Sequence, residues 1–112
     1  MSEQLLAYPI GGLKVRVKAL DPHKTMSKES VALIVDAITL SNRKQWVLPG
    51  VFQGEESGIR IEWTSKTTHV ALEVEEDGTV WLFRMELKGN FTGYFMTSDP
   101  AEALKKLEEY MP

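Results

Sequence analysis

The clearest indication of the fold is the stretch Val70-Ala-Leu-Glu-Val-Glu-Glu-Asp-Gly-Thr-Val-Trp-Leu-Phe-Arg-Met85. The central pair Asp77-Gly78 is typical of a two-residue type I′ turn, which joins two antiparallel strands in a hairpin. With that turn, the predicted ladder pairs are Glu76 with Thr79, Val74 with Trp81, Leu72 with Phe83, and Val70 with Met85. We therefore expect most bulky apolar residues of the hairpin to share one face of a sheet, with Val80 and Leu82 as exceptions.

A third strand precedes this hairpin. Apolar and polar residues alternate over 59–64, and a short turn around 65–68 places this strand antiparallel beside 70–75. Pairing Trp63 with Val70 sets Arg60 opposite Glu73. The expected product is a three-stranded meander with one apolar face. Its other face is solvent-exposed and combines charged with apolar side chains. The charged residues, which surround Val80 and Leu82, are Arg60, Glu62, Glu73, Glu75 and Arg84.

The segments outside the meander add a strand and two helices to the prediction. Alternation over 13–20 predicts a strand, and a wide apolar arc over 28–43 predicts a helix. A last helix starts at the N-cap Asp99, with Pro100 first in the helix and Glu102 placed to complete a capping box.

Two connecting segments are less regular. The glycine- and proline-containing segment 45–58 predicts a loop, and 91–96 is a short strand or a loop. The predicted class is α+β with two layers, an antiparallel β-meander with helices packed on one face, in the order strand, helix, three strands, helix.

Length and composition predict one domain over 1–112. The chain has 112 residues, of which 43% are hydrophobic and 26% charged, close to globular averages. It has no cysteine, which excludes disulfides and thiolate sites and fits a reducing compartment. No apolar run reaches the roughly 18 residues that span a bilayer, and the first residues lack a signal-peptide pattern. We therefore expect a cytoplasmic protein without membrane contact.

Charge argues against a general nucleic-acid binder, because the formal net charge is −3. A basic stripe of Lys14, Arg16 and Lys18 nevertheless lies on one face of the predicted strand 13–20. It could receive a phosphate backbone or an acidic protein surface. Alternatively, these side chains only prevent unwanted pairing of an edge strand.

The sequence contains no recognisable set of catalytic residues. Glu62, Glu73 and Glu75 could form a metal or acid–base site, but the nearby arginines favour a solvated, charge-compensated face. The only histidines, His23 and His69, fall in predicted turns far apart in sequence. We therefore assign no catalytic residue, no metal ligand and no cofactor.

The aromatic residues outside the meander are the best functional clue. As exposed side chains they would anchor a protein interface, and as buried ones they would cap the ends of a small core. The candidate interface residues are Trp46, Phe52, Phe91, Tyr94 and Phe95.

One stretch resembles a pattern in small uncharacterised bacterial proteins. The matching residues are Gly58-Ile-Arg-Ile-Glu62-Trp63, then Leu72-Glu-Val-Glu75 and Asp77-Gly78, with a proline-containing loop ahead. In that pattern two glycines precede the strand that ends in Glu-Trp, whereas here Ser57 replaces the first glycine. The resemblance covers about a third of the chain. It implies a bacterial or phage origin and supplies no activity and no functional residues.

These observations favour a small non-catalytic protein-interaction domain. An inhibitor, an antitoxin-like protein or an immunity-like protein would be of this type, and self-association as a homodimer is also expected. The alternative is a small ligand-binding domain or enzyme with an unrecognised pocket that uses Glu62, Glu73, Glu75 or His69.

Overall fold

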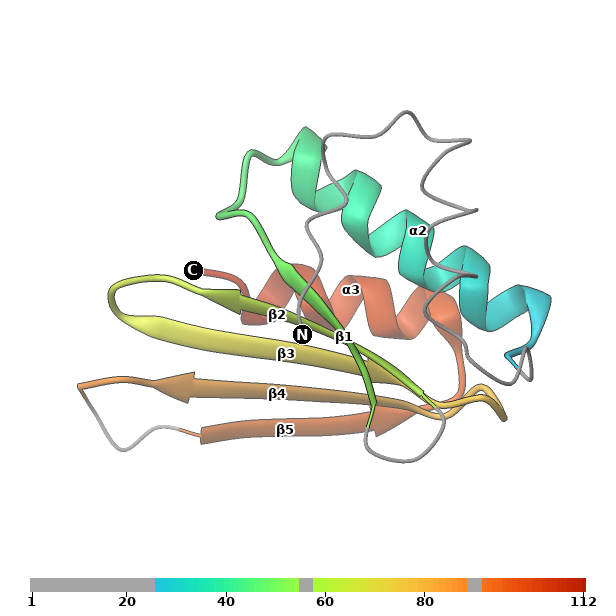
Figure 1. Cartoon of the computed structure of the whole chain (residues 1–112). Coiled ribbons are helices and arrows are strands. Elements are labelled where there is room, and N and C mark those ends of the chain that lie inside the picture. The colour runs from blue at the N-terminus through green and yellow to red at the C-terminus, as the bar shows by residue number, and fades with distance from the viewer. Residues whose placement is uncertain (1–25, 55–57, 89–91) are drawn as a thin grey trace.

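The structure is a computed structural model that describes residues 26–54, 58–88 and 92–112. Over these residues the chain forms a five-stranded antiparallel sheet with the strand order β1-β2-β3-β4-β5. The elements in chain order are α2 (Lys28–Arg43), β1 (Gly50–Gln53), β2 (Ile59–Thr64), β3 (Thr68–Val74), β4 (Val80–Glu86), β5 (Thr92–Thr97) and α3 (Pro100–Tyr110). Figure 1 shows α2 and α3 on the same face of the sheet, which confirms the predicted two-layer α+β class.

The structure adds two strands to the meander and confirms the predicted helix over 28–43. The loop prediction for 45–58 is wrong at 50–53, where β1 pairs with β2 and buries Val51 against the helices. The segment between Pro49 and Gly54 has only four residues, too few to show the apolar–polar alternation of a strand. At the other edge of the sheet, the segment predicted as a short strand or a loop forms the strand β5. The predicted strand over 13–20 lies outside the described residues, as does His23.

The β3–β4 hairpin has a register one residue away from the predicted one. Its turn is longer, because Glu75 N–H donates to the carbonyl of Thr79 at 2.8 Å and Gly78 N–H donates to the carbonyl of Glu75 at 3.1 Å. A type I′ turn needs positive φ at both central residues. Gly78 has a φ of 94°, but among the described residues the only non-glycine with positive φ is Gln45. The three residues 76–78 therefore form the loop, and Val74 lies opposite Val80.

This one-residue difference reverses the expected faces of β4. Leu72 pairs with Leu82 instead of Phe83, and Val70 pairs with Arg84 instead of Met85. Val80 and Leu82 are thus core residues, buried beneath the helices. Because side chains alternate along a strand, the neighbouring residues turn to the opposite face. These are Trp81, Phe83 and Met85.

The core lies between the sheet and both helices. The predicted alternation of β2 is confirmed, since Ile59, Ile61 and Trp63 are all buried. The apolar arc of α2 covers them, and α3 adds Ala103 and Leu107. No helix in the described part of the chain is long and apolar enough to cross a membrane.

Helix α3 begins at the predicted N-cap, but the capping box takes another form. The Asp99 carboxylate accepts from Ala101 N–H at 3.0 Å. Glu102 accepts from the hydroxyl of Thr97, and that hydroxyl accepts from the N–H of Asp99. Thr97, the last residue of β5, therefore stands between the two members of the expected box and fixes the helix start to the sheet.

Candidate functional site

One face of the sheet carries large apolar side chains and no described helix. The alternation of β4 and β5 directs five of them to this face. We call them the open-face patch: Trp81, Phe83, Met85, Tyr94 and Met96. Tyr94 is 61% exposed, Met96 54% and Met85 39%, although all three lie within strands. Exposed large apolar side chains gathered in one patch mark sites of interaction.

The patch is continuous across two strands. Trp81 lies opposite Met96, and Phe83 lies opposite Tyr94. The rings of Trp81 and Tyr94 are in contact, with centroids 5.6 Å apart and planes tilted by 46°. Contacts of this kind hold aromatic side chains in place before a partner arrives, which lowers the entropy lost on binding.

The β2–β3 half of the same face is charged. Arg60 bridges Glu62 at 2.5 Å and Glu73 at 3.6 Å, and the predicted pairing of Arg60 with Glu73 is confirmed. Two carboxylates thus share one guanidinium, which leaves this half with an excess negative charge. His69 lies on the same face and hydrogen-bonds Thr64 at 2.8 Å through Nδ1.

The predicted mixed face is wrong for all of its β4 members, because Val80 and Leu82 are also buried on the helix face. Arg84 lies on the helix face, in register with Val70. Within the ranges that the structure describes, no group of three or more histidine, aspartate or glutamate residues could hold a metal ion. The arrangement is that of a solvated surface on which Arg60 compensates part of the carboxylate charge.

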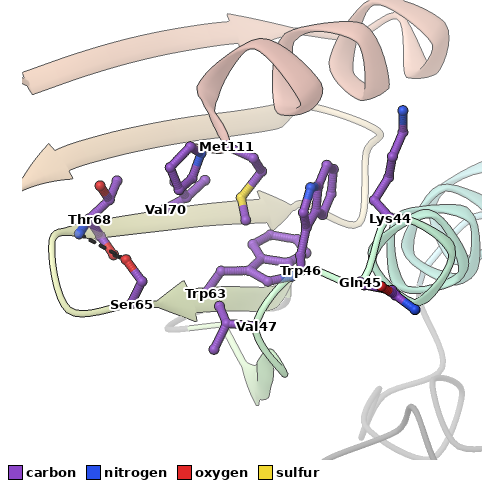
Figure 2. Close-up of a pocket in the computed structure, with 10 residues that line it drawn as sticks. Lys44, Gln45, Trp46, Val47, Trp63, Ser65, Thr68, Val70 and Met111 are labelled. Carbon is purple, nitrogen blue, oxygen red and sulfur yellow. Dashed lines mark hydrogen bonds between the residues drawn. The ribbon is translucent and has the colours of Figure 1, made fainter.

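A pocket of about 380 Å³ opens at the end of the sheet where β2 turns into β3. The loop after α2 reaches it through Trp46, whose ring meets that of Trp63 edge to face at 6.2 Å and 87°. Figure 2 shows Trp46, Trp63, Val70 and Met111 around this space, with Ser65 and Thr68 at its polar side. The positive φ of Gln45, 56°, turns the chain at the end of α2 just ahead of Trp46.

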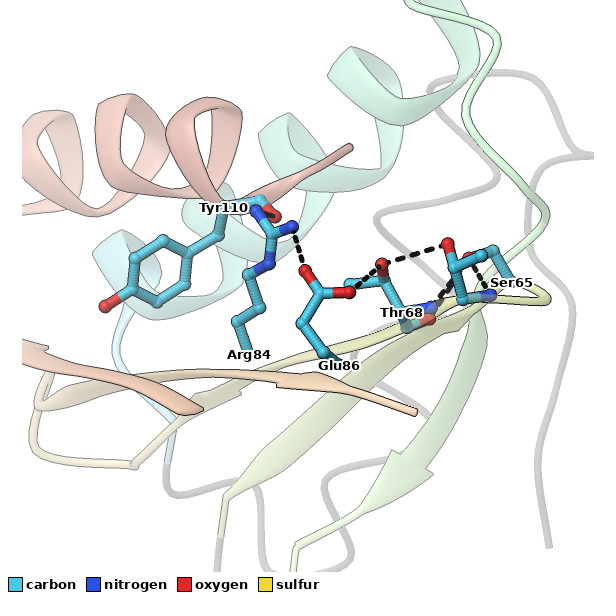
Figure 3. A network of polar contacts seen from close by, with 6 residues as sticks. Ser65, Thr68, Arg84, Glu86 and Tyr110 are labelled. Atoms are coloured by element: carbon cyan, nitrogen blue, oxygen red, sulfur yellow. Dashed lines mark hydrogen bonds and ion pairs between the residues drawn. The ribbon is translucent and has the colours of Figure 1, made fainter. Parts of the chain in front are cut away.

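A polar network ties the end of α3 to the sheet beside this pocket (Figure 3). Arg84 donates to the backbone carbonyl of Tyr110 at 3.0 Å and to Glu86 at 2.5 Å. Glu86 also accepts from the hydroxyl of Thr68 at 3.4 Å. An arginine at the C-terminal end of a helix stabilises its last carbonyl groups. This network is therefore part of the architecture that shapes the pocket.

The predicted interface aromatics occupy different places. Tyr94 belongs to the open-face patch, and Phe52 lies half-buried on the same face at the β1 edge. Trp46 and Phe95 are partly buried and pack against the core, and Lys106 lies 4.9 Å from the Phe95 ring centre. Phe91 lies outside the described residues.

The sequence pattern does not identify Trp81, Phe83, Met85 and Met96 as residues of the open face. The wrong hairpin register assigns the first three to the core face. The residues of the turn leave the register open: glycine takes a positive φ at little cost and aspartate less readily, so a three-residue loop with one positive φ at Gly78 is available beside the two-residue turn.

Comparison of the chain with protein-family models, with curated proteins and with solved structures finds no match. Its function has to be inferred from the geometry of the chain itself.

Proposed function

We propose that this chain is a small non-catalytic interaction domain that binds a protein partner through the open face of its sheet. The observation that carries the proposal is the open-face patch, in which Tyr94 and Met96 are each more than half exposed although both lie within a regular strand. A single exposed apolar residue needs no explanation, but a contiguous group on one sheet face does.

The partner should combine an apolar surface with a basic margin. Its apolar part would cover Trp81, Tyr94 and Met96, residue types that are enriched at interface centres. Its basic margin would face the β2–β3 half, where Glu62 and Glu73 share Arg60. Complementary charge chiefly sets the association rate and the orientation of the complex. This composition suits a stoichiometric inhibitor, antitoxin-like or immunity-like protein, with the cytoplasm as its expected location.

The test has two steps. A partner is first identified by co-purification with the tagged full-length chain. Its affinity is then measured by calorimetry with both proteins purified. We expect a stoichiometric complex, and Met85→Lys should weaken it at least about tenfold, because a lysine would be placed within the apolar patch that the partner covers.

Leu48→Lys is the matched control. Leu48 is 55% exposed, even more than Met85, but lies in the loop before β1 and not on the open face. A complex weakened equally by both substitutions, or by neither, would contradict binding through the open face. Glu73→Lys should lower the association rate and reduce its dependence on salt.

The pocket beside Trp46 supports a second candidate function, binding of a small apolar ligand. Its volume of about 380 Å³ lies within the range of ligand sites, and its floor is aromatic. Titration with indole as a probe, followed by nuclear magnetic resonance, tests this function. Saturable shifts at Trp46 and Met111 that disappear in Trp46→Ala would support it, and the absence of shifts at millimolar indole would exclude it.

A further inference from the structure

Strand β5 ends the sheet on the side away from β1. It pairs with β4 on one side, and none of the strands in the described ranges pairs with its other side. In Figure 1 it forms the lower border of the sheet. An edge strand presents a row of backbone N–H and C=O groups that can accept another strand.

The two edges of this sheet are protected to different degrees. β1 has only four residues and directly follows the buried Pro49. β5 has six residues, Thr92-Gly-Tyr-Phe-Met-Thr97, without a charged residue or a proline. Proteins usually protect long edges with lysines, prolines, bulges or a covering element. The composition of β5 is therefore that of a strand suited to pairing.

We propose that β5 pairs antiparallel with β5 of a second copy of this chain, about a two-fold axis. The chain has a net charge of −3, so two copies repel each other over most approaches. An uncharged strand avoids that repulsion, and a two-fold contact requires a surface that is compatible with itself.

The helix layer next to this edge is also compatible with a second copy. Lys106 of α3 lies over the ring of Phe95, and its ammonium is 3.5 Å from the carboxylate of Glu109. Lys106, the cation over Phe95, therefore has an anionic neighbour on its own helix, so its charge is compensated before a second copy approaches.

Edge pairing would also join the open-face patches of the two copies. Tyr94 and Met96 lie on the strand at the axis, and their side chains lie on the open face. The paired sheets would present one continuous apolar surface, twice the size of the single patch. Pairing follows from the edge and its composition, and it does not depend on the identity of any other partner.

Light scattering and hydrogen exchange on the full-length chain test the pairing. We expect a molar mass that rises toward twice that of one chain with concentration, together with slower exchange of the β5 amides. A monomer at all concentrations would overturn the proposal. The same result would be seen if another segment of the same chain occupied the edge of β5. A dimer in which β5 exchange does not change would also overturn the proposal.

Disulfide trapping tests the register of the β5–β5 pairing. The natural chain has no cysteine, so only introduced cysteines can cross-link. Facing residues of antiparallel strands are about 4.5–5.5 Å apart between Cα atoms, within the range of a disulfide. Tyr94→Cys, Met96→Cys and their equimolar mixture cover two-fold axes at Tyr94, Phe95 and Met96. We expect one of these three samples to cross-link rapidly on mild oxidation.

Two controls separate edge pairing from other contacts. Met85→Cys lies on the open face one strand inside the edge, and Leu48→Cys is an exposed site away from the sheet face. Neither should cross-link. Efficient trapping through Met85→Cys would mean that copies stack face to face, and it would overturn edge pairing while leaving the patch as the binding surface.

Discussion

The indole N–H of Trp63 donates a hydrogen bond to the hydroxyl of Ser41, at 2.9 Å, in the interior of the protein. Trp63 comes from β2 and Ser41 from the last turn of α2, and both side chains are buried. This bond fixes the end of α2 over the sheet and sets the position from which the chain continues to Trp46 and the pocket.

Ser41→Ala should therefore destabilise the protein by about 1–3 kcal/mol, because it leaves a buried indole N–H without its acceptor. Urea unfolding measures the change. Asn42→Ala, at the exposed neighbouring position, is the control and should stay within about 0.5 kcal/mol of the natural chain. Equal stability of Ser41→Ala and the natural chain would mean that the bond contributes nothing.

Removal of Arg84 should loosen the end of α3. Arg84→Met loses the hydrogen bonds to Tyr110 and Glu86, and we expect a loss of about 1.5–3 kcal/mol in the free energy of unfolding. Amides in the last turn of α3 should exchange faster with solvent. The double variant Arg84→Met, Glu86→Leu should lose less than the sum of the two single variants, because the two residues interact directly. Strict additivity would show that the ion pair is not coupled.

Two glycines should differ in their tolerance of alanine. A Cβ at Gly78 would meet nothing within 4 Å, so Gly78→Ala should cost only the strain of its positive φ, about 1–2 kcal/mol. A Cβ at Gly58 would lie 2.6 Å from the carbonyl oxygen of Val74, and backbone must move to admit it. Gly58→Ala should therefore be the more destabilising in urea unfolding. The reverse order would mean that the backbone around Val74 yields at little cost.

Asp77 should contribute to the acid sensitivity of the protein. Its pKa is lowered from 3.8 mainly because its carboxylate accepts a hydrogen bond from the N–H of Thr79, at 2.9 Å. A lowered pKa in the folded state gives stability that is complete above the unfolded value of 3.8. This stability is lost as the pH falls through the lower folded value.

Asp77→Asn keeps an acceptor oxygen but does not titrate. The difference in unfolding free energy between about pH 7 and about pH 3 should therefore be smaller in the variant than in the natural chain. An identical pH dependence in the two proteins would contradict the role of the Thr79 hydrogen bond. Glu76→Gln, in the same loop, serves as the comparison for general charge effects.

The elements with strong local signals follow from the order of the residues alone. The apolar arc and its polar stripe fixed α2 over 28–43, the Asp99-Pro100 pair fixed the start of α3, and alternation fixed the buried side of β2. In each case the period of the side chains or the chemistry of a cap is a local property, so no knowledge of the rest of the fold is needed.

Which face of β4 is buried depends instead on how the hairpin packs against the helices. Two turns of the same residues, differing by one in loop length, are both compatible with Asp77-Gly78, and the choice between them reverses every side chain of the strand. The observed turn places Val80 and Leu82 under the helices and exposes the open-face patch. The patch and the exposed position of β5 among the described strands depend on how strands and layers lie relative to one another, which the order of residues along the chain does not show.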